Sequence, residues 1–355
     1  MLFAHSQYEK ATAELGIEYH AYDTADEYQQ LLADASWLNT PNTIPKFLRQ
    51  HVLPRSERIM ALIEDKLEPG DMLIAPPLFD IAPRIVAEKL GLRLLSAFLA
   101  PAQVALSPLR TLMFEKVLAP QINSLRQRHQ LLDVADWQQW LRYSNPSLAL
   151  WPAWFAPSEA NWIEGVTPTG FLMGRDNVDQ LPLEVREFLS AYPNPVLLTG
   201  GTGAFLDASF YRPSIEAITN LEVPAIVVTR YTDQLPERLS DQILVARQLP
   251  FSRLIPHTSL VIHHGGIGTT AETLRSGRPQ LILAQGADRP DNGARIQRLG
   301  VGDSLAPAQW TVAEIANRIN QLRKSRAIQE RCSELAETIK QEQSNSDKPW
   351  LAALN

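Results

Sequence analysis

The sequence of 355 residues has only one cysteine, Cys332. One cysteine cannot form a disulfide within the chain or a zinc site built from cysteines, and such low usage is typical of a reducing cytosol. Long apolar runs are also lacking: the nearest, Leu92 to Leu106, is interrupted by Arg93, Pro101 and Gln103, whereas a helix that spans a bilayer needs about 20 apolar residues. The first residues lack the charged and then apolar layout of a secretory signal. We therefore expect a cytoplasmic protein without a transmembrane segment.

Neither sign of charge dominates the sequence. Lysine and arginine number 33 against 39 aspartates and glutamates, which gives a formal net charge of −6. Because no basic excess is available to neutralise a phosphate backbone, we expect no nucleic-acid partner. Peripheral membrane contact through a surface patch stays open. Apolar residues make up 45% of the chain and charged residues 20%, so the sequence can bury a large core, and its length corresponds to about two domains.

Short apolar runs alternate with amphipathic stretches along most of the chain. Runs typical of strands and stretches typical of helices follow one another in turn, an order that predicts the α/β class, with parallel sheets covered by helices on both faces. The predicted strands are residues 71–75, 92–97, 195–199, 225–229, 260–263 and 280–284. The predicted helices are residues 82–90, 211–220, 270–276 and 291–299, and a longer helical run over 311–343 breaks near Ser325.

A segment rich in proline, glycine and tryptophan, Trp151–Gly174, divides the chain. Proline and glycine interrupt helices and strands, so the segment predicts a connection between two Rossmann-like domains that face a cleft. We expect an N-terminal domain over residues 1–160 and a C-terminal domain over residues 161–340. The tail, residues 341–355, is predicted to pack back toward the N-terminal domain. Open parallel sheets bind ligands at the carboxyl ends of their strands, where the cleft would lie.

A glycine-rich turn and a helix start follow the predicted strand that ends at His263 or His264. Glycines let the backbone approach a ligand closely, and the first N–H groups of a helix carry partial positive charge, which together favour an anion. Two threonine hydroxyls add donors, and Glu272, one turn inside the helix, could reach the hydroxyls of a ribose. By itself the pattern fits equally well a capped strand–helix turn without a ligand. The residues of this turn are Gly265, Gly266, Gly268, Thr269 and Thr270.

A second polar cluster follows the next predicted strand. Gly277-Arg278-Pro279 precedes that strand, and Asp288, Arg289 and Asn292 follow it, ahead of another helix. Because both strands are expected in one parallel sheet, the two clusters converge on a single cleft. The second cluster therefore favours a bound ligand over an empty turn.

Together, these residues resemble the donor-binding signature of the UDP-glycosyltransferase-like family of GT-B glycosyltransferases. That signature is His-Gly-Gly-x-Gly-Thr, then Glu, Gly-x-Pro and Asp-Gln, with Asn following. Leu198–Thr202 resembles the Gly-Ser turn after the first strand of the family's C-terminal domain. Trp151–Pro157 and Thr169–Phe171 resemble the bacterial branch that includes rhamnosyltransferases and sterol glucosyltransferases. In this sequence the signature is His264–Thr269, Glu272, Gly277-Arg278-Pro279, Asp288-Arg289 and Asn292.

The resemblance implies an inverting, metal-independent hexosyltransferase that uses no cofactor. Its donor would be a nucleotide-diphosphate sugar, UDP- or dTDP-hexose, and its acceptor a hydroxyl group of a small lipophilic compound. Asp288 would bind the donor sugar with Asn292 beside it. Glu272 would bind the ribose, and Thr202 would lie near the diphosphate. The residues implied to hold the diphosphate are His264, Gly265, Gly266, Gly268, Thr269 and Thr270.

Two positions of the site depart from the family pattern. The family's glutamine after the aspartate is Arg289 here. An arginine brings a charge and five donors where an amide is expected, so the donor sugar stays open. The aromatic residue that stacks on the nucleobase is replaced by Gln248, two residues before Pro250, and Phe251 follows as a partial substitute. The base pocket is therefore assigned to Gln248 and Phe251, with uridine and thymidine both open.

A third departure concerns the first residues. Residues 1–9 resemble the family's second strand and the helix after it, and no glycine-rich loop before Ser96 matches the family's opening, which carries the catalytic base. We therefore expect an N-terminal domain without its first, central strand, and the catalytic base stays unknown. Donor binding should be normal, transfer slow and solubility poor. The alternatives are a sugar-nucleotide-binding protein with impaired catalysis and, with less support, a sugar-nucleotide epimerase of GT-B fold.

The remaining histidines and tryptophans have simpler interpretations. His263 is predicted to end its strand with a hydrogen-bonded imidazole, whereas His5 and His20 are predicted to lie on the surface, although an acceptor base could come from either. No metal site is expected, because the adjacent histidines of a strand point to opposite faces. Four tryptophans could line an acceptor pocket but more often pack in a core. They are Trp37, Trp137, Trp140 and Trp154.

Overall fold

The computed structural model divides the chain into two compact units, which are described separately here. Of the described residues, one unit holds residues 1–150 and 165–169, and the other holds residues 151–157 and 170–344. The structure describes residues 1–35, 42–77, 79–105, 107–142, 147–157, 165–173, 180–201 and 206–344. Three sites of prediction lie outside these ranges: Trp37, Thr202 and the part of the tail after residue 344.

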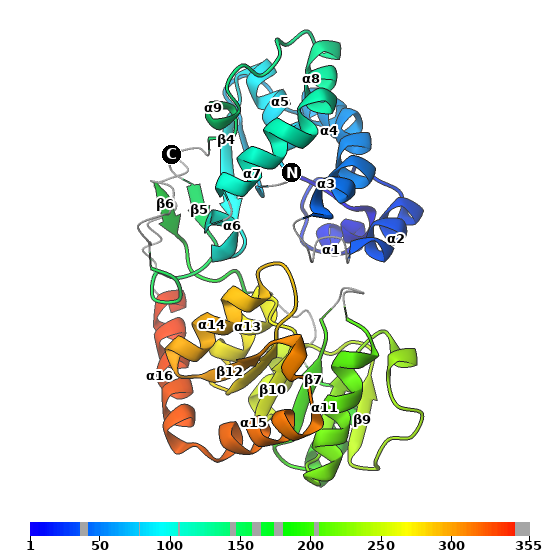
Figure 1. The fold of residues 1–355 in the computed structure, drawn as a ribbon, viewed down its shortest axis with the longest axis vertical. Coiled ribbons are helices and arrows are strands. Elements are labelled where there is room, and N and C mark those ends of the chain that lie inside the picture. The colour runs from blue at the N-terminus through cyan, green and yellow to red at the C-terminus, as the bar shows by residue number, and fades with distance from the viewer. Residues whose placement is uncertain are drawn as a thin grey trace. The chain divides into compact units, whose positions relative to one another are not determined.

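The C-terminal unit is built on a six-stranded sheet in which every pairing is parallel. The strand order is β12-β11-β10-β7-β8-β9 (Figure 1). In chain order this is the 3-2-1-4-5-6 arrangement of a doubly wound fold, whose order reverses between β7 and β10. The strands are β7 (Val196–Thr199), β8 (Ala225–Val228), β9 (Ile243–Ala246), β10 (Leu260–His263), β11 (Gln280–Leu283) and β12 (Gly302–Leu305).

Alternating side chains of these strands form two apolar cores. Val196 and Leu198 of β7 pack in one core with side chains of α11 and α15, whereas Leu197 packs in the other, beside Val185 of α10. Both faces of the sheet are therefore covered, as a sheet of continuous apolar runs requires. The helices are α10 (Leu183–Ala191), α11 (Ala208–Asn220), α12 (Phe251–Leu254), α13 (Ile267–Arg275), α14 (Arg289–Leu299), α15 (Val312–Lys324) and α16 (Arg326–Ser344).

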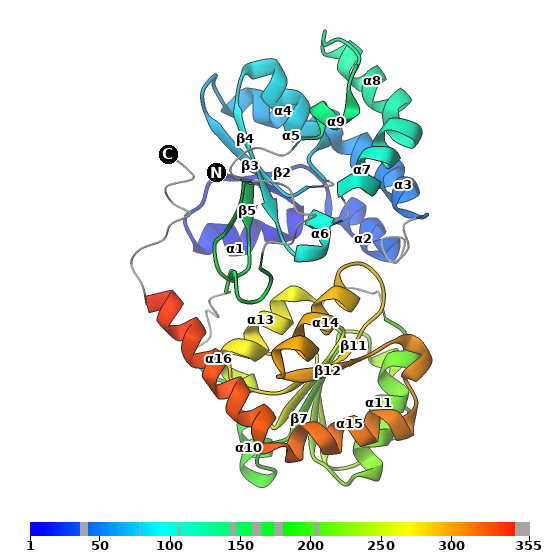
Figure 2. The same cartoon turned by 60° about the vertical axis from the view of Figure 1, so that its left-hand side comes forward.

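The long C-terminal helical run breaks at Ser325, as predicted. Ser325 has extended backbone angles and separates α15 from α16, which follow each other with a bend in Figure 2. The only cysteine, Cys332, lies buried in α16, and burial raises the pKa of its thiol to about 12. The thiol therefore stays protonated at neutral pH and is a poor nucleophile.

The N-terminal unit has its strands in two separate parallel sheets. β1 (Leu2–Ala4) pairs with β2 (Tyr19–Ala21). The second sheet has the order β3-β4-β5-β6 and comprises β3 (Met72–Ala75), β4 (Arg93–Phe98), β5 (Ser147–Ala149) and β6 (Val166–Pro168). Ile74 of the edge strand β3 is 49% exposed. The expected loss of a central strand in this domain stays a prediction, and it is compatible with two sheets that do not pair in the described residues.

Two long helical segments of this unit each contain a wide, π-helical turn. The first runs from α3 (Ile44–Phe47) through the turn η3 (Leu48–Val52) into α4 (Leu53–Lys66). The second runs from α7 (Ser107–Met113) through the turn η4 (Phe114–Leu118) into α8 (Ala119–Arg128). π-Helical turns are rare and often occur at functional sites.

The other helices of the N-terminal unit are short, and the longest of them, α5, has 10 residues. They are α1 (Glu9–Glu14), α2 (Ala25–Ala33), α5 (Ile81–Leu90), α6 (Pro101–Ala105) and α9 (Trp137–Trp140). Among the described residues, no helix combines the length and the apolar composition needed to cross a membrane.

Candidate functional site

A cavity of about 450 Å³ lies where the strand order of the C-terminal sheet reverses. Thr199 ends β7 and pairs in register with His263, which ends β10. The segments that leave both strands line the cavity, with Gly201 on one side and Gly266 on the other. The crevice outside the carboxyl ends of the strands, at such a reversal, is where open α/β sheets bind their ligands.

His263 supports the glycine-rich turn from beneath. Nε2 of its buried imidazole lies 2.9 Å from Gln280 Oε1, and Nδ1 accepts a hydrogen bond from the N–H group of Gly265 at 3.1 Å. Because Nδ1 accepts, the ring proton is on Nε2, which donates to Gln280. Burial lowers the pKa of His263 to about 4, so the ring is neutral at pH 7. The prediction of a hydrogen-bonded histidine at the end of the strand is confirmed.

His264 fills the space between the two glycine segments. A Cβ atom on Gly201 or on Gly266 would collide with its imidazole, so both positions need glycine. Gly201 also has a φ of +79°, in the region that other residues rarely adopt. Burial, with smaller electrostatic contributions from His263 and Arg289, lowers the pKa of His264 to about 3. The neutral ring lines the cavity, and its Nδ1 has no hydrogen-bond partner among the described residues.

The start of α13 faces the cavity without a side-chain cap. Gly266 is the N-cap residue and has extended backbone angles. Gly268 and Thr269 line the cavity, and the buried Thr270 Oγ1 makes no hydrogen bond within the described part of the chain. The first N–H groups of a helix have no partner inside the helix, so this end can donate to an anion.

Glu272, Gln248 and Phe251 also line this cavity, as the sequence predicts for residues of one site. The Glu272 carboxylate is held by Arg275, one turn further along α13, with Arg275 Nε 3.2 Å from Glu272 Oε2. Gln248 accepts a hydrogen bond from Arg230 Nη2 at 3.0 Å. A ribose would therefore meet a carboxylate that is already paired and oriented.

The second predicted cluster joins the turn through Asn292 rather than by lining the cavity. The Asn292 amide donates to Gly265 O and to Asp288 Oδ2, both at 2.9 Å. Burial raises the pKa of Asp288. Arg289 is buried as well and donates from Nη1 to Gln285 O at 2.7 Å. The structure thus brings Asp288 and Asn292 together as predicted, while the role of Arg289 in donor binding stays a prediction.

Two arginines of the cavity were not predicted. Arg230 and Arg247 lie just after β8 and β9, at the same edge of the sheet as the glycine turns. Their position directly after a strand was the available signal, but the short run that forms β9 was not recognised as a strand. Arg230 and Arg247 thus add two cationic side chains to the lining of the cavity.

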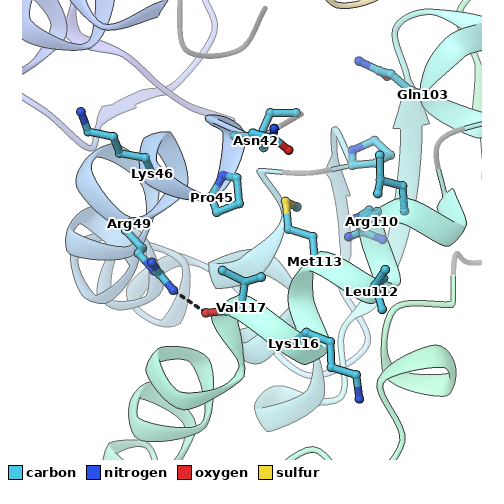
Figure 3. Close-up of a pocket in the computed structure, with 13 residues that line it drawn as sticks. Asn42, Pro45, Lys46, Arg49, Gln103, Arg110, Leu112, Met113, Lys116 and Val117 are labelled. Carbon is cyan, nitrogen blue, oxygen red and sulfur yellow. Dashed lines mark hydrogen bonds between the residues drawn. The ribbon is translucent and has the colours of Figure 1, made fainter. Parts of the chain in front are cut away.

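A second cavity, of about 630 Å³, lies within the N-terminal unit (Figure 3). Its walls come mainly from α3 and η3 on one side and from α7 and η4 on the other. Trp137 does not line it: its ring packs in the apolar core and against Trp140. Trp154 instead donates from Nε1 to Glu342 at 2.9 Å. The interpretation of these tryptophans as packing residues is the one that the contacts support.

His5 is not the simple surface histidine that the sequence suggested. It follows β1, and its Nδ1 lies 2.6 Å from Oδ2 of Asp23, which follows β2 and is fully buried. The other oxygen of Asp23 accepts the N–H group of Ser6 at 2.8 Å. Because β1 and β2 are parallel and adjacent, their carboxyl ends bring these two residues together. His20 pairs with the exposed Glu18, at 2.9 Å.

Within the described ranges, no group of three or more histidine, cysteine, aspartate or glutamate side chains is placed to hold a metal ion.

Comparisons with known proteins find glycosyltransferases similar to this chain in sequence and others similar to it in fold. Residues 214–347 match the family described as "Erythromycin biosynthesis protein CIII-like, C-terminal domain". The chain is 38% identical over 128 residues to the vancomycin aglycone glucosyltransferase of Amycolatopsis orientalis, which covers 35% of this chain and 31% of that protein. It is 27% identical over 191 residues to UDP-glycosyltransferase 2 of Phaeomoniella chlamydospora, which covers 51% of this chain and 40% of that protein. The matched segments thus span less than half the length of these relatives.

Solved structures match over nearly the whole chain. The glycosyltransferase of kitacinnamycin superimposes with a TM-score of 0.72 at 17% identity, covering 96% of this chain and 87% of that one. The glycosyltransferase VinC, solved in complex with dTDP, superimposes with a TM-score of 0.69 at 16% identity, covering 95% and 87%. At this level of identity the likeness establishes the fold.

Proposed function

We propose that this chain, which resembles UDP-glycosyltransferase-like proteins of the GT-B fold, transfers a hexose from a nucleotide-diphosphate sugar to a hydroxyl group of a lipophilic acceptor. The observation that carries the proposal is the cavity between β7 and β10, where an uncapped helix start meets two glycine segments and His264. The proposed reaction is inverting and needs no metal ion.

The start of α13 supplies the electrostatic part of the mechanism. In glycosyl transfer the bond from the anomeric carbon to the diphosphate breaks, and negative charge grows on the departing diphosphate. Backbone N–H groups and the hydroxyl groups of Thr269 and Thr270 are fixed donors that can stabilise this charge without reorganising. His264 is neutral because of its burial, so it contributes a hydrogen bond rather than a charge.

The adjacent cluster is proposed to bind the sugar. Asn292 ties the Asp288 carboxylate to the backbone of the glycine turn through Gly265 O, so the carboxylate is oriented relative to the diphosphate site. A carboxylate accepts hydrogen bonds from sugar hydroxyls. Relatives at the sequence and structure level include a glucosyltransferase and a protein solved with dTDP, which supports a hexose donor and leaves the choice of base open.

The proposed acceptor base is His5. Its Nδ1 faces the buried Asp23, so in the tautomer with the proton on Nδ1 the other nitrogen, Nε2, can take a proton from an acceptor hydroxyl. Asp23 would stabilise the imidazolium that forms. A buried carboxylate that orients a histidine is the arrangement general bases commonly use. Asp23 is fully buried, whereas Asp34, which pairs with His51 at 3.0 Å, and Glu18, which pairs with His20, are both partly exposed.

Product analysis tests the proposal directly. The protein is incubated with UDP- and dTDP-hexoses and a set of hydrophobic phenols and alcohols, and products are identified by mass spectrometry. Glycosides are expected with at least one donor. A protein that binds nucleotide sugars without forming a glycoside would be a sugar-nucleotide-binding protein. Conversion of the donor sugar to an epimer without an acceptor would point to an epimerase instead.

A further inference from the structure

The cavity of the N-terminal unit has an apolar lining that suits a hydrophobic ligand. Ile44, Pro45, Leu109, Leu112 and Met113 contribute to its walls. Figure 3 shows Pro45 and Met113 directed toward the space between the two helical segments. Its volume of about 630 Å³ lies within the range of about 300–1,000 Å³ that is typical of small-molecule sites.

The charged side chains of this lining are all cationic. Among the thirteen described residues that line the cavity are Lys46, Arg49, Arg110 and Lys116, and no aspartate or glutamate. Two acids lie outside the lining: Glu115 pairs with Lys116, and Asp80 with Arg110. Arg110 and Lys116 are therefore already paired with carboxylates, and the cation on which the inference rests is Arg49.

Arg49 is the cation that the structure places most clearly for a ligand. It belongs to the wide turn η3, and its Nη2 donates to Val117 O of the wide turn η4 at 2.7 Å. This bond holds the guanidinium across the space between the two segments (Figure 3). The carbonyl accepts a hydrogen bond but does not neutralise the charge, and in the described part of the chain no carboxylate oxygen lies within 4.0 Å of Arg49.

We propose that this cavity binds a lipophilic compound with a carboxylate group, whose apolar skeleton contacts Met113 and its neighbours and whose carboxylate pairs with Arg49. A planar guanidinium offers two parallel N–H donors that match the two oxygens of a carboxylate. The step from ligand to acceptor rests on the proposed function: the bound acid would be the compound that receives the sugar. Binding itself does not depend on transfer.

Calorimetry with two probes of the same shape tests the charge. The probes are 2-naphthoate and its neutral analogue 2-naphthamide, titrated into the protein in the absence of any nucleotide sugar. The acid is expected to bind more tightly than the amide. Arg49→Gln should lower the affinity for the acid by about fivefold, which is the scale of a partly exposed ion pair, and leave the affinity for the amide unchanged. Arg49→Lys, which keeps the charge, should retain most of the affinity for the acid.

Two further variants test the location and the choice of Arg49. Met113→Trp fills the apolar part of the cavity and should abolish binding of both probes. Lys116→Gln removes a cation that is already paired with Glu115, so it should leave the affinity for both probes unchanged. Equal affinity for acid and amide in the parent protein, or binding that survives Met113→Trp, would overturn the inference. Nucleotide-sugar binding is followed in the same variants, and its absence in the parent would count against the proposed function and not against this cavity.

Discussion

Gly268 tests the diphosphate site at the scale of one residue. It is exposed at the second position of α13, and a Cβ atom placed on it meets no other atom within 4 Å. A larger side chain therefore fits the fold but projects into the cavity. We expect Gly268→Val to abolish nucleotide-sugar binding, as measured by calorimetry. The affinity of Gly268→Ala should lie between that of Gly268→Val and that of the parent. The circular dichroism spectrum should not change.

The neighbouring glycines provide a contrast for this variant. A Cβ atom on Gly266 would collide with His264, and one on Gly293 would collide with Ser304 of β12. Gly293→Val should therefore lower stability, whereas Gly268→Val should lower only binding. A Gly268→Val protein that binds nucleotide sugars as tightly as the parent would remove the start of α13 from the donor site.

Asp288 separates recognition of the sugar from recognition of the nucleotide. Its carboxylate is positioned by Asn292, and burial raises its pKa, so it sits in a sheltered place where a lost hydrogen bond to a sugar hydroxyl is costly. Asp288→Ala should weaken binding of the nucleotide sugar by about tenfold or more, and binding of the free nucleotide diphosphate much less. Calorimetry with both ligands measures the difference, and equal losses would assign Asp288 to the nucleotide or to the fold.

At the scale of an element, the histidines at the end of β10 make the stability of the fold depend on pH. A histidine whose pKa is lower in the folded than in the unfolded chain stays neutral in the fold. Protonation of the unfolded chain then favours unfolding. The stability that His263 contributes is therefore present above about pH 6.5 and is lost as the pH falls toward its folded value of about 4. His264 acts in the same direction, and Asp288, whose pKa is raised, acts in the opposite one.

A variant isolates the contribution of His263. His263→Asn keeps an acceptor near the N–H group of Gly265 but cannot be protonated. Between pH 6.5 and pH 5 the free energy of unfolding of the parent should fall more steeply than that of the variant, by up to about 1.4 kcal/mol per pH unit. Urea titrations at several pH values measure both slopes. Parallel slopes would mean that the pKa of His263 is the same in the folded and unfolded chains.

The sequence predicted the parts of the site that are local along the chain. β7, β8, β10 and β11 were recognised because each is a continuous apolar run, as strands buried on both faces are. The glycine turn after β10 and the helix after it were recognised because both follow directly. β9, with only partly buried side chains, and the very short β5 and β6 were not.

Features that depend on long-range packing could not be predicted. The second cavity needs η3 and η4, which are about 65 residues apart and meet through Arg49 and Val117. The pair of His5 and Asp23 needs the parallel register of β1 and β2, which places Ala4 beside Ala21. The sequence around His5 does not predict a contact with Asp23, and the sequence around Asp23 does not predict one with His5. Expectations about wide helical turns are also out of reach, because no simple periodicity marks them.

At the scale of the whole molecule, the proposed reaction is divided between the two units. The C-terminal unit holds the cavity assigned to the donor, and the N-terminal unit holds both the apolar cavity and the candidate base. The sequence led us to expect slow transfer, because no residue of the family's base loop could be identified. If His5, held by Asp23, supplies the base, turnover will depend on residues of the N-terminal unit, whereas the affinity for the donor will depend on residues of the C-terminal cavity.

His5 provides the test of that division. Because its Nδ1 is held by Asp23, His5→Asn removes the proton acceptor and leaves every residue of the donor cavity in place. Turnover should fall by about 100-fold or more, the usual contribution of a general base, while the affinity for the nucleotide sugar stays the same. His20→Asn, whose partner is the exposed Glu18, is the matched control and should leave turnover unchanged. Turnover is measured by product formation and affinity by calorimetry. A His5→Asn protein that transfers sugar at the parent rate would exclude His5 as the base and assign the step to another residue of the N-terminal unit.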